Sequence, residues 1–218
     1  MFTLHLFTVA LHIQIWSPVI PDFTYCLLQL LLLAELFLHS SSRPTHGSSL
    51  CGVLGSIIHQ VDRLVNISKK LHELSGDELL DVAAVANRLP GLPNMQHTAA
   101  HLSSLKVNES LSQLYVYAQS FKLHTDWLKT EKDNFSLPSQ SAEGASTHLL
   151  RLSNLIVMSL HQMSEEVPQP TPPCLPVAST TFDVLQFSVE ISERLQTFCD
   201  WSKRVLRLLK TQSRCPRH

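Results

Sequence analysis

The sequence is short of glycine, of charge and of alternating β-branched residues. Only 6 of its 218 residues are glycine, and charged side chains make up 16% of the chain. Because strands need alternating apolar and polar residues bounded by turns, this composition does not favour a β-sheet. The formal net charge of −1 also provides no overall field that would attract nucleic acid. These scarcities predict an all-α protein without a nucleic-acid partner.

Motifs for catalysis and metal binding are also missing. The chain has no Gly-rich phosphate loop, no G-x-S-x-G elbow and no paired-carboxylate signature. His72-Glu73 begins the pattern H-E-x-x-H, but Gly76 stands where the second histidine is needed. His97 and His101 are four residues apart, yet no carboxylate or thiol completes a metal set. The sequence therefore predicts no enzyme, no metal site and no cofactor.

The N-terminal region is typical of a leader. Residues 27–38 (LLQLLLLAELFL) form an apolar run that is too short to span a bilayer but suits a signal peptide. Small residues at Ser40 and Ser42 favour cleavage after Ser42. Glu35 interrupts the run and no basic segment precedes it, so an anchored or differently started chain is the alternative. We expect a leader over 1–42, then a secreted domain over 43–218 without stable membrane insertion.

Sequons and cysteines fit a secreted chain. Three N-x-S sequons predict N-glycosylation at Asn66, Asn108 and Asn134. Cys26 would leave with the leader. An even number of cysteines then remains, which allows three disulfide connectivities and suits no zinc motif: Cys51, Cys174, Cys199 and Cys215.

Four segments carry the three- and four-residue spacing of apolar side chains that marks an amphipathic helix. We predict helices over about 50–74, 102–132, 145–163 and 179–211. In the last segment this spacing runs from Leu185 to Leu209. Oxygens that suit a helix N-cap stand ahead of it, at Thr180, Thr181 and Asp183. Gly76 is expected to end the first helix, with a short helical patch over 78–87 after it.

The connections between these helices are long, short and long. Residues 77–101 include two prolines and a glycine that exclude a continuous helix, and residues 133–144 form a short polar turn. Residues 165–177 hold five prolines, which favour an extended strap. A short loop forces antiparallel neighbours, whereas a long crossover lets successive helices run parallel. The order predicts a long-chain four-helix bundle with up-up-down-down topology and two long crossovers, as in cytokines.

The end of the closing helix carries a distinctive run of residues. Residues 199–211 (CDWSKRVLRLLKT) contain an Asp200-Trp201 pair, Arg204 three residues after the tryptophan, a leucine-rich stretch and a final Lys-Thr. This run resembles the closing helix of the interleukin-11 family. The proline strap with residues 178–182 (ASTTF), and Leu92-Pro93, resemble the same family's two long connections. Mammalian members are basic and lack cysteine in the mature chain. The near-neutral charge and four cysteines here point to a divergent form, such as one from a non-mammalian vertebrate.

The resemblance implies a signalling ligand that binds an α-receptor and then recruits glycoprotein 130 to activate JAK/STAT signalling. The α-receptor surface of the family lies at the end of the last helix, which implies Arg204 together with Asp200 and Arg207. A second surface uses an aromatic at the start of that helix, here Phe182. A third lies on the outward faces of the first and third helices, where the helical wheel suggests Arg63, Lys70 and Arg151.

The predicted topology relates these positions to one another. With two helices up and two down, Phe182 and Arg204 lie at opposite ends of the bundle. The same geometry brings Cys51 near Cys215, and we predict that disulfide ahead of one between Cys174 and Cys199. We expect the free chain to be a monomer.

Several alternatives stay open from the residues alone. Phe182 either packs against the strap or anchors an interface. The basic cluster over 203–217 is either a solvated helix end or a surface for heparin or nucleic acid. The chain as a whole is alternatively a cytokine of the leukaemia inhibitory factor and ciliary neurotrophic factor type, or a secreted carrier with a cavity between its helices.

Overall fold

The computed structural model describes residues 50–83, 89–95, 104 and 106–215. The predicted leader and the pair His97 and His101 lie outside the described residues. The described part is helical and contains no strand. Its helices are α3 (Leu50–Ser68), α4 (Gly76–Ala83), α6 (Val107–Asn134), α7 (Gln140–Gln162) and α8 (Thr181–Gln212).

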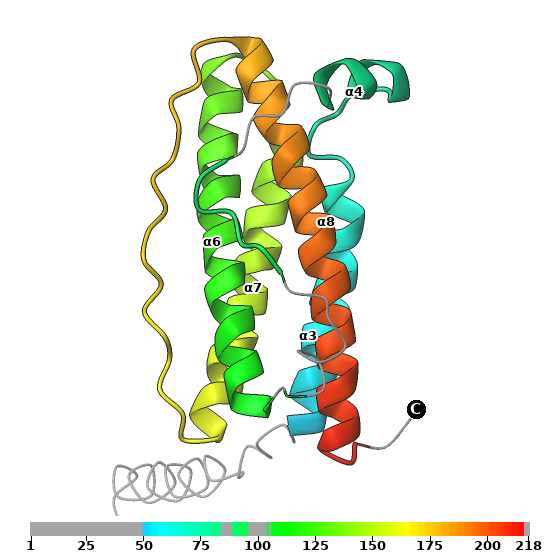
Figure 1. Cartoon of the computed structure of the whole chain (residues 1–218), viewed down its shortest axis with the longest axis vertical. Helices are drawn as coiled ribbons and strands as arrows, with labels where there is room; N and C mark the ends of the chain where they lie inside the picture. Colours follow the sequence, from blue (N-terminus) through cyan, green and yellow to red (C-terminus); the bar gives the residue numbers. More distant parts are fainter. Residues whose placement is uncertain (1–49, 84–88, 96–103, 105, 216–218) are drawn as a thin grey trace, which may run out of the picture. The chain divides into compact units, whose positions relative to one another are not determined.

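The four long helices form a bundle with up-up-down-down topology, which confirms the predicted fold class. In Figure 1, α3 and α6 run in one direction and α7 and α8 run in the other. Helices α3 and α6 each pack against both α7 and α8, and the short α4 packs against α8. The strap over 163–180 runs back along α6 to the start of α8 (Figure 1). Among the described residues, no helix combines the length and hydropathy that a membrane span requires.

Aromatic side chains fill the middle of the bundle, where α6 meets α8. The ring centroids of Phe121 and Phe198 lie 5.1 Å apart, and those of Tyr117 and Trp201 lie 5.4 Å apart. Phe121 and Phe198 are fully buried, and Trp201 is 1% exposed. Such pairs stabilise a core beyond the burial of their apolar area. The interior between α6 and α8 is therefore packed with protein side chains.

Helix α3 ends at Ser68, whereas the sequence predicted an end near residue 74. The carbonyl groups beyond the last turn are bonded by side chains of other helices instead of by a continued helix. The Ser192 hydroxyl donates to the Ser68 carbonyl oxygen over 2.7 Å, and the buried Lys132 ammonium donates to the Leu71 carbonyl oxygen over 2.6 Å. Tertiary contacts from α6 and α8 thus fix the end of α3.

The sequence predicted that Gly76 ends the first helix, but Gly76 instead begins α4. Ser75 stands just before it, and the Glu78 carboxylate accepts from the Ser75 backbone N–H over 2.9 Å and from the Ser75 hydroxyl over 2.7 Å. The S-x-x-E spacing of Ser75 and Glu78 is a helix-start signature that was readable in the sequence.

Helix α7 begins at Gln140 and not near residue 145, so the turn after α6 covers only residues 135–139. Gly144, which was assigned to the turn, lies inside the helix. A Cβ built at Gly144 would lie 3.8 Å from Ile67 Cδ1 of α3. Packing between α7 and α3 therefore outweighs the low helix propensity of this glycine. Helix α6 begins at Val107 and not near residue 102, and it ends two residues after its predicted end at 132. Helix α8 matches its prediction within two residues.

The two long connections meet on the surface of α6. Gly91 has φ +82°, and a Cβ built there would lie 2.4 Å from Cβ of Pro173 in the strap. The Ser120 hydroxyl donates to the Gly91 carbonyl oxygen over 2.8 Å. The Leu89 N–H donates to a Glu190 carboxylate oxygen over 2.8 Å, which ties the same loop to α8. Residues 89–91 therefore join the first connection to the strap and to two helices.

Candidate functional site

The C-terminal third of α8 presents charged side chains on its outer face. Asp200, Arg204 and Arg207 are all exposed and stand four and three residues apart, so they are neighbours on one side of the helix. No ion pair within the described residues involves these three side chains. Trp201 points the other way and is buried. The structure thus brings the three predicted α8 residues together on an open surface.

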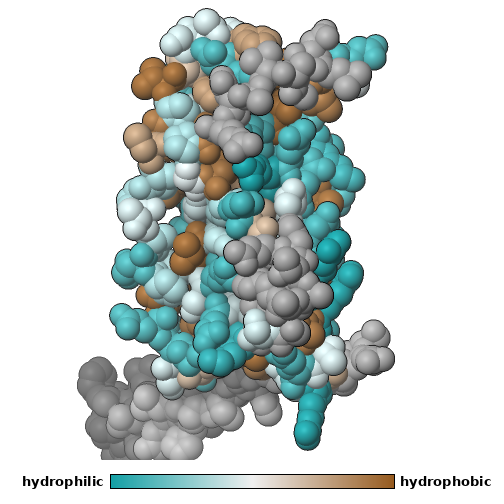
Figure 2. Space-filling model, in the orientation of Figure 1, coloured by the Kyte–Doolittle hydropathy of each residue, from teal (hydrophilic) through white to brown (hydrophobic). Residues whose placement is uncertain are grey.

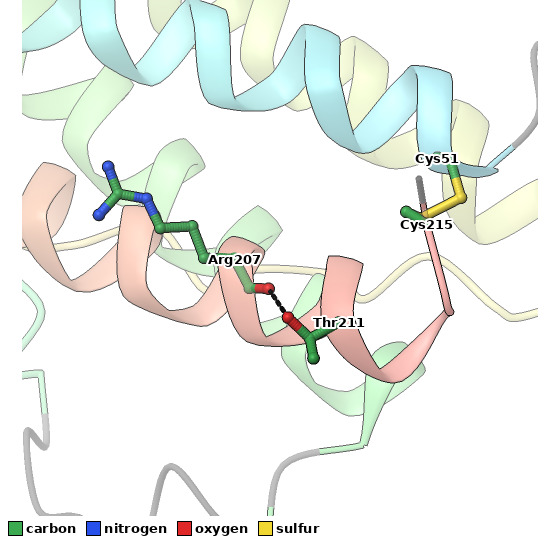
Figure 3. Close-up of a disulfide and its surroundings, with 4 residues drawn as sticks. All are labelled: Cys51, Arg207, Thr211 and Cys215. Carbon is green, nitrogen blue, oxygen red and sulfur yellow. Dashed lines mark hydrogen bonds between the residues drawn. A yellow bond between two sulfur atoms is a disulfide. The ribbon is translucent and has the colours of Figure 1, made fainter. Parts of the chain in front are cut away.

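A disulfide holds this end of α8 against the start of α3. Figure 3 shows the bond between Cys51 and Cys215, whose Cα atoms lie 5.5 Å apart. The Thr211 hydroxyl donates to the Arg207 carbonyl oxygen over 3.0 Å in the last turns of α8 (Figure 3). Because both ends of the covalent link are at helix ends, the link restrains the segment that carries Arg207.

An ion pair adds a second tie between the same two helices. Lys203 Nζ on α8 lies 2.7 Å from Asp62 Oδ1 on α3. The Lys203 side chain is 20% exposed, so the pair is partly shielded from water. The Lys203 ammonium is therefore paired within the bundle, whereas the neighbouring Arg204 side chain is exposed to solvent.

The opposite end of α8 carries the predicted aromatic. Phe182 is 46% exposed in the first turn of α8. Thr180 caps this turn, because its hydroxyl accepts from the Asp183 N–H over 3.1 Å while Asp183 Oδ2 accepts from the Thr180 N–H over 2.8 Å. Hydrogen bonding of the Asp183 carboxylate with the Ser179 N–H, followed by the Thr180 side chain and the Thr180 N–H, lowers the pKa of the Asp183 carboxyl. A complete capping box therefore fixes the helix turn that presents Phe182.

Phe182 and Arg204 lie at opposite ends of one helix. At a rise of 1.5 Å per residue they are separated by about 33 Å along the axis. In the view of Figure 2, more hydrophobic side chains appear in the half of the bundle at which α8 begins. The two surfaces are thus far apart and differ in chemistry.

A third group of predicted residues lies across α3 and α7. Arg63 and Arg151 are exposed on the two helices. Between them, the His148 Nδ1–H donates to Gln60 Oε1 over 3.0 Å. Burial, followed by the nearby guanidinium groups of Arg151 and Arg63, lowers the pKa of His148. The structure therefore brings Arg63 and Arg151 to one basic surface, which we call the α3–α7 surface.

Lys70, the third predicted residue of this group, lies beyond the end of α3. It is exposed in the turn after Ser68, seven residues from Arg63. Because α3 ends at Ser68, helical spacing does not fix the side of the bundle on which Lys70 lies relative to Arg63. It forms no ion pair within the part of the chain that the structure describes.

Three exposed apolar side chains were not singled out from the sequence. Leu150 is 44% exposed and Met158 is 51% exposed on α7, and Val177 is 88% exposed in the strap. Leu150 and Met158 are apolar but fall outside the inward-facing row of their helix. This mismatch was a signal in the sequence that both side chains face outward. Val177 stands among prolines, where no periodicity separates inward from outward positions.

The three sequons differ in their surroundings. Asn66 is exposed on α3, and Asn134 is exposed at the last residue of α6. Asn108 is half-buried, and its Nδ2 donates to Glu165 Oε1 over 3.0 Å. The side-chain nitrogens of Asn66 and Asn134 are thus more open than that of Asn108.

Cys174 and Cys199 are free thiols, so the disulfide considered between them does not form. Cys174 is exposed in the strap. Cys199 is buried, and burial raises the pKa of its thiol to about 12. Cys199 is therefore a packing residue without a reactive thiolate. Among the described residues, no three His, Cys, Asp or Glu side chains are grouped to hold a metal ion.

Comparison with known protein families concerns nearly the whole described region. The chain matches the family described as Interleukin 11 over residues 44–213. No individual curated protein matches it significantly. The matched range contains all the described helices, from Leu50 to Gln212. The helical bundle and this match together confirm the resemblance seen in the closing helix. The chain therefore belongs to the interleukin-11 family of helical cytokines.

Proposed function

We propose that this chain is a secreted cytokine that binds an interleukin-11-type α-receptor and then recruits glycoprotein 130 to activate JAK/STAT signalling. One observation carries the proposal. An exposed arginine surface and an exposed aromatic lie at opposite ends of the single helix α8. A ligand with this arrangement holds different receptor chains at its two ends, and it needs no catalytic group to do so.

The arginine surface is suited to the α-receptor. Arg204 and Arg207 are free to form bidentate bonds with carboxylates of a partner, and Asp200 beside them offers an acceptor. The disulfide at this end of α8 reduces the freedom that binding would otherwise remove. Charge complementarity then sets both the rate of encounter and the register of the complex.

The remaining two surfaces are suited to glycoprotein 130. Phe182 is the kind of partly exposed aromatic that becomes an energetic centre when a partner covers it. The α3–α7 surface offers Arg63, Lys70 and Arg151 to a second copy of the receptor. Two separate contacts of this kind allow one ligand to bring two signalling chains together.

The packed interior argues against the carrier alternative. A carrier needs a cavity between its helices, whereas Phe121, Phe198 and Trp201 fill the space between α6 and α8. The match to the interleukin-11 family likewise argues against the alternative of a cytokine of the leukaemia inhibitory factor and ciliary neurotrophic factor type.

Binding of the secreted chain to an interleukin-11 α-receptor ectodomain tests the proposal. We expect Arg204→Glu to weaken binding at least tenfold, or about 1.4 kcal/mol, because the reversed charge faces the same partner groups. Lys69→Glu is the matched control, since Lys69 is an exposed cation in the turn after α3, away from this surface. Equal affinities for the parent chain and Arg204→Glu would contradict the assigned surface.

Recruitment of glycoprotein 130 is measured separately, on the preformed complex with the α-receptor. Phe182→Ala is expected to leave α-receptor binding unchanged and to weaken this second step, because only the far end of α8 is altered. Failure of the folded parent chain to bind the α-receptor would reject the proposed function.

A further inference from the structure

Asn66 lies inside the side of α3 that we assign to glycoprotein 130. It stands three residues after Arg63 and four before Lys70, and all three side chains are exposed. Asn66 and Arg63 both lie within α3, and residues three apart on a helix are neighbours, with Cβ atoms roughly 5–6 Å apart. A group attached to Asn66 would therefore lie beside Arg63, one of the cations of the α3–α7 surface.

The Asn66 amide is available for attachment. No hydrogen bond of its side chain occurs within the part of the chain that the structure describes, in contrast to the Asn108 amide, which donates to Glu165 over 3.0 Å. The side chain points away from the core, because Leu64 and Ser68 on the same helix are buried. A bulky glycan at Asn66 would displace no packed side chain.

The Ser68 hydroxyl of this sequon is buried in the folded protein. Ser68 is fully buried, and its hydroxyl donates to the Val65 carbonyl oxygen over 3.0 Å. The Ser68 carbonyl oxygen in turn accepts from Ser192 of α8 over 2.7 Å. Modification of Asn66 must therefore precede the docking of α3 onto α8. No further glycan is then added to Asn66 once the chain has folded.

The sequon at Asn134 has the opposite property. Asn134 and Ser136 are both exposed, at the turn between α6 and α7. This turn lies at the end of the bundle where α8 begins, as Figure 1 shows. A glycan at Asn134 would lie at the end of the bundle that carries Phe182, whereas Arg63 lies within α3, so Asn134 serves as a comparison site away from Arg63.

We propose that an N-glycan at Asn66 shields the α3 half of the α3–α7 surface and thereby weakens recruitment of glycoprotein 130, while the α-receptor surface stays open. The inference rests on the proposed function. In the modification, Asn66 Nδ2 loses a proton and bonds to the anomeric carbon of a lipid-pyrophosphate-linked oligosaccharide. The bond between that carbon and the phosphate oxygen breaks, and the lipid pyrophosphate leaves. The fraction of chains that carry this glycan then sets the fraction of ligand whose α3–α7 surface is shielded on its α3 half.

The test compares three chains secreted from eukaryotic cells: the parent, Asn66→Gln and Asn134→Gln. Glutamine keeps the polarity of asparagine and suits an exposed helix position, so Asn66→Gln removes only the sequon. Occupancy is measured by peptide mass spectrometry, through the conversion of Asn66 to Asp when the glycan is released enzymatically. Affinity is measured for the α-receptor ectodomain and then for glycoprotein 130 on the preformed complex.

We expect Asn66 to be occupied and Asn66→Gln to tighten the glycoprotein 130 step on the order of tenfold, as when a central charged contact is regained. Affinity for the α-receptor should be the same in all three chains, and Asn134→Gln should tighten the glycoprotein 130 step less than Asn66→Gln. An unmodified Asn66, or equal glycoprotein 130 affinity for the parent and Asn66→Gln, would overturn the inference and leave the proposed function standing. Absence of α-receptor binding by every chain would instead reject both.

Discussion

Two glycines of this chain lie in opposite environments. Gly55 lies within α3, and a Cβ added there would meet nothing within 4 Å. Gly91 has φ +82°, and a Cβ there would lie 2.4 Å from Pro173 Cβ. At the first site glycine only adds freedom to the unfolded chain. At the second it permits both a left-handed backbone and the close approach of the strap.

The two alanine substitutions should therefore have opposite effects on stability. We expect Gly55→Ala to raise the free energy of unfolding by about 0.5–1 kcal/mol, because alanine is the better helix former. We expect Gly91→Ala to lower it by at least about 1 kcal/mol, because a residue with a Cβ is strained at positive φ. Urea unfolding followed by circular dichroism measures both. A stabilising Gly91→Ala would show that the strap does not press on this loop.

At the scale of elements, the start of α8 depends on one carboxylate. Asp183 accepts hydrogen bonds from the Ser179 and Thr180 backbone N–H groups, which lower its pKa in the folded chain. Since the unfolded chain keeps the ordinary pKa, ionised Asp183 favours folding above that ordinary value. The stabilisation is lost as the pH falls through the lowered pKa of the folded state.

Asp183→Asn removes this titration, so it gives a direct pH test. We expect the parent chain to be more stable than Asp183→Asn near neutral pH, and the difference to shrink below about pH 4, where carboxyl groups take up protons. Denaturant unfolding of both proteins from pH 7 to pH 2 measures the difference, in which other titrating groups largely cancel. A difference that stays constant down to pH 2 would contradict the role of the carboxylate.

The sequence was enough to predict that the four long helices exist. It predicted a helix end only where the capping groups lie within a few residues of that end. The start of α8 was indicated by Thr180 and Asp183, which lie three residues apart. The end of α3 was not, because Ser192 bonds the Ser68 carbonyl group from 124 positions away and Lys132 bonds the Leu71 carbonyl group just beyond it from 61 positions away. No local pattern carries that information.

The same limit applies to the candidate surfaces. Helical periodicity was enough to predict that Arg63 and Arg151 face outward, and both are exposed. Their meeting around His148 depends on how α3 and α7 pack, which periodicity does not specify. Val177, at 88% exposed, lies in a strap whose prolines set no inward and outward alternation.

At the scale of the whole molecule, the topology makes one covalent closure possible. Helix α3 starts and α8 ends at the same end of the bundle, as Figure 1 shows. The disulfide between Cys51 and Cys215 closes a loop with a sequence separation of 164 residues. It therefore encloses almost all of the described chain. In the unfolded state such a link removes many extended conformations, which favours the folded bundle.

Replacing both cysteines should therefore destabilise the bundle without leaving a new free thiol. We expect Cys51→Ala combined with Cys215→Ala to lower the free energy of unfolding by about 2–5 kcal/mol, the range for a long closed loop. Cys174→Ser is the control, because that thiol is exposed and unbridged, and it should leave stability unchanged. Denaturant unfolding under non-reducing conditions measures all three proteins. A loss no larger than that of Cys174→Ser would mean that Lys203–Asp62 and the α3–α8 packing hold this end of the bundle without the covalent link.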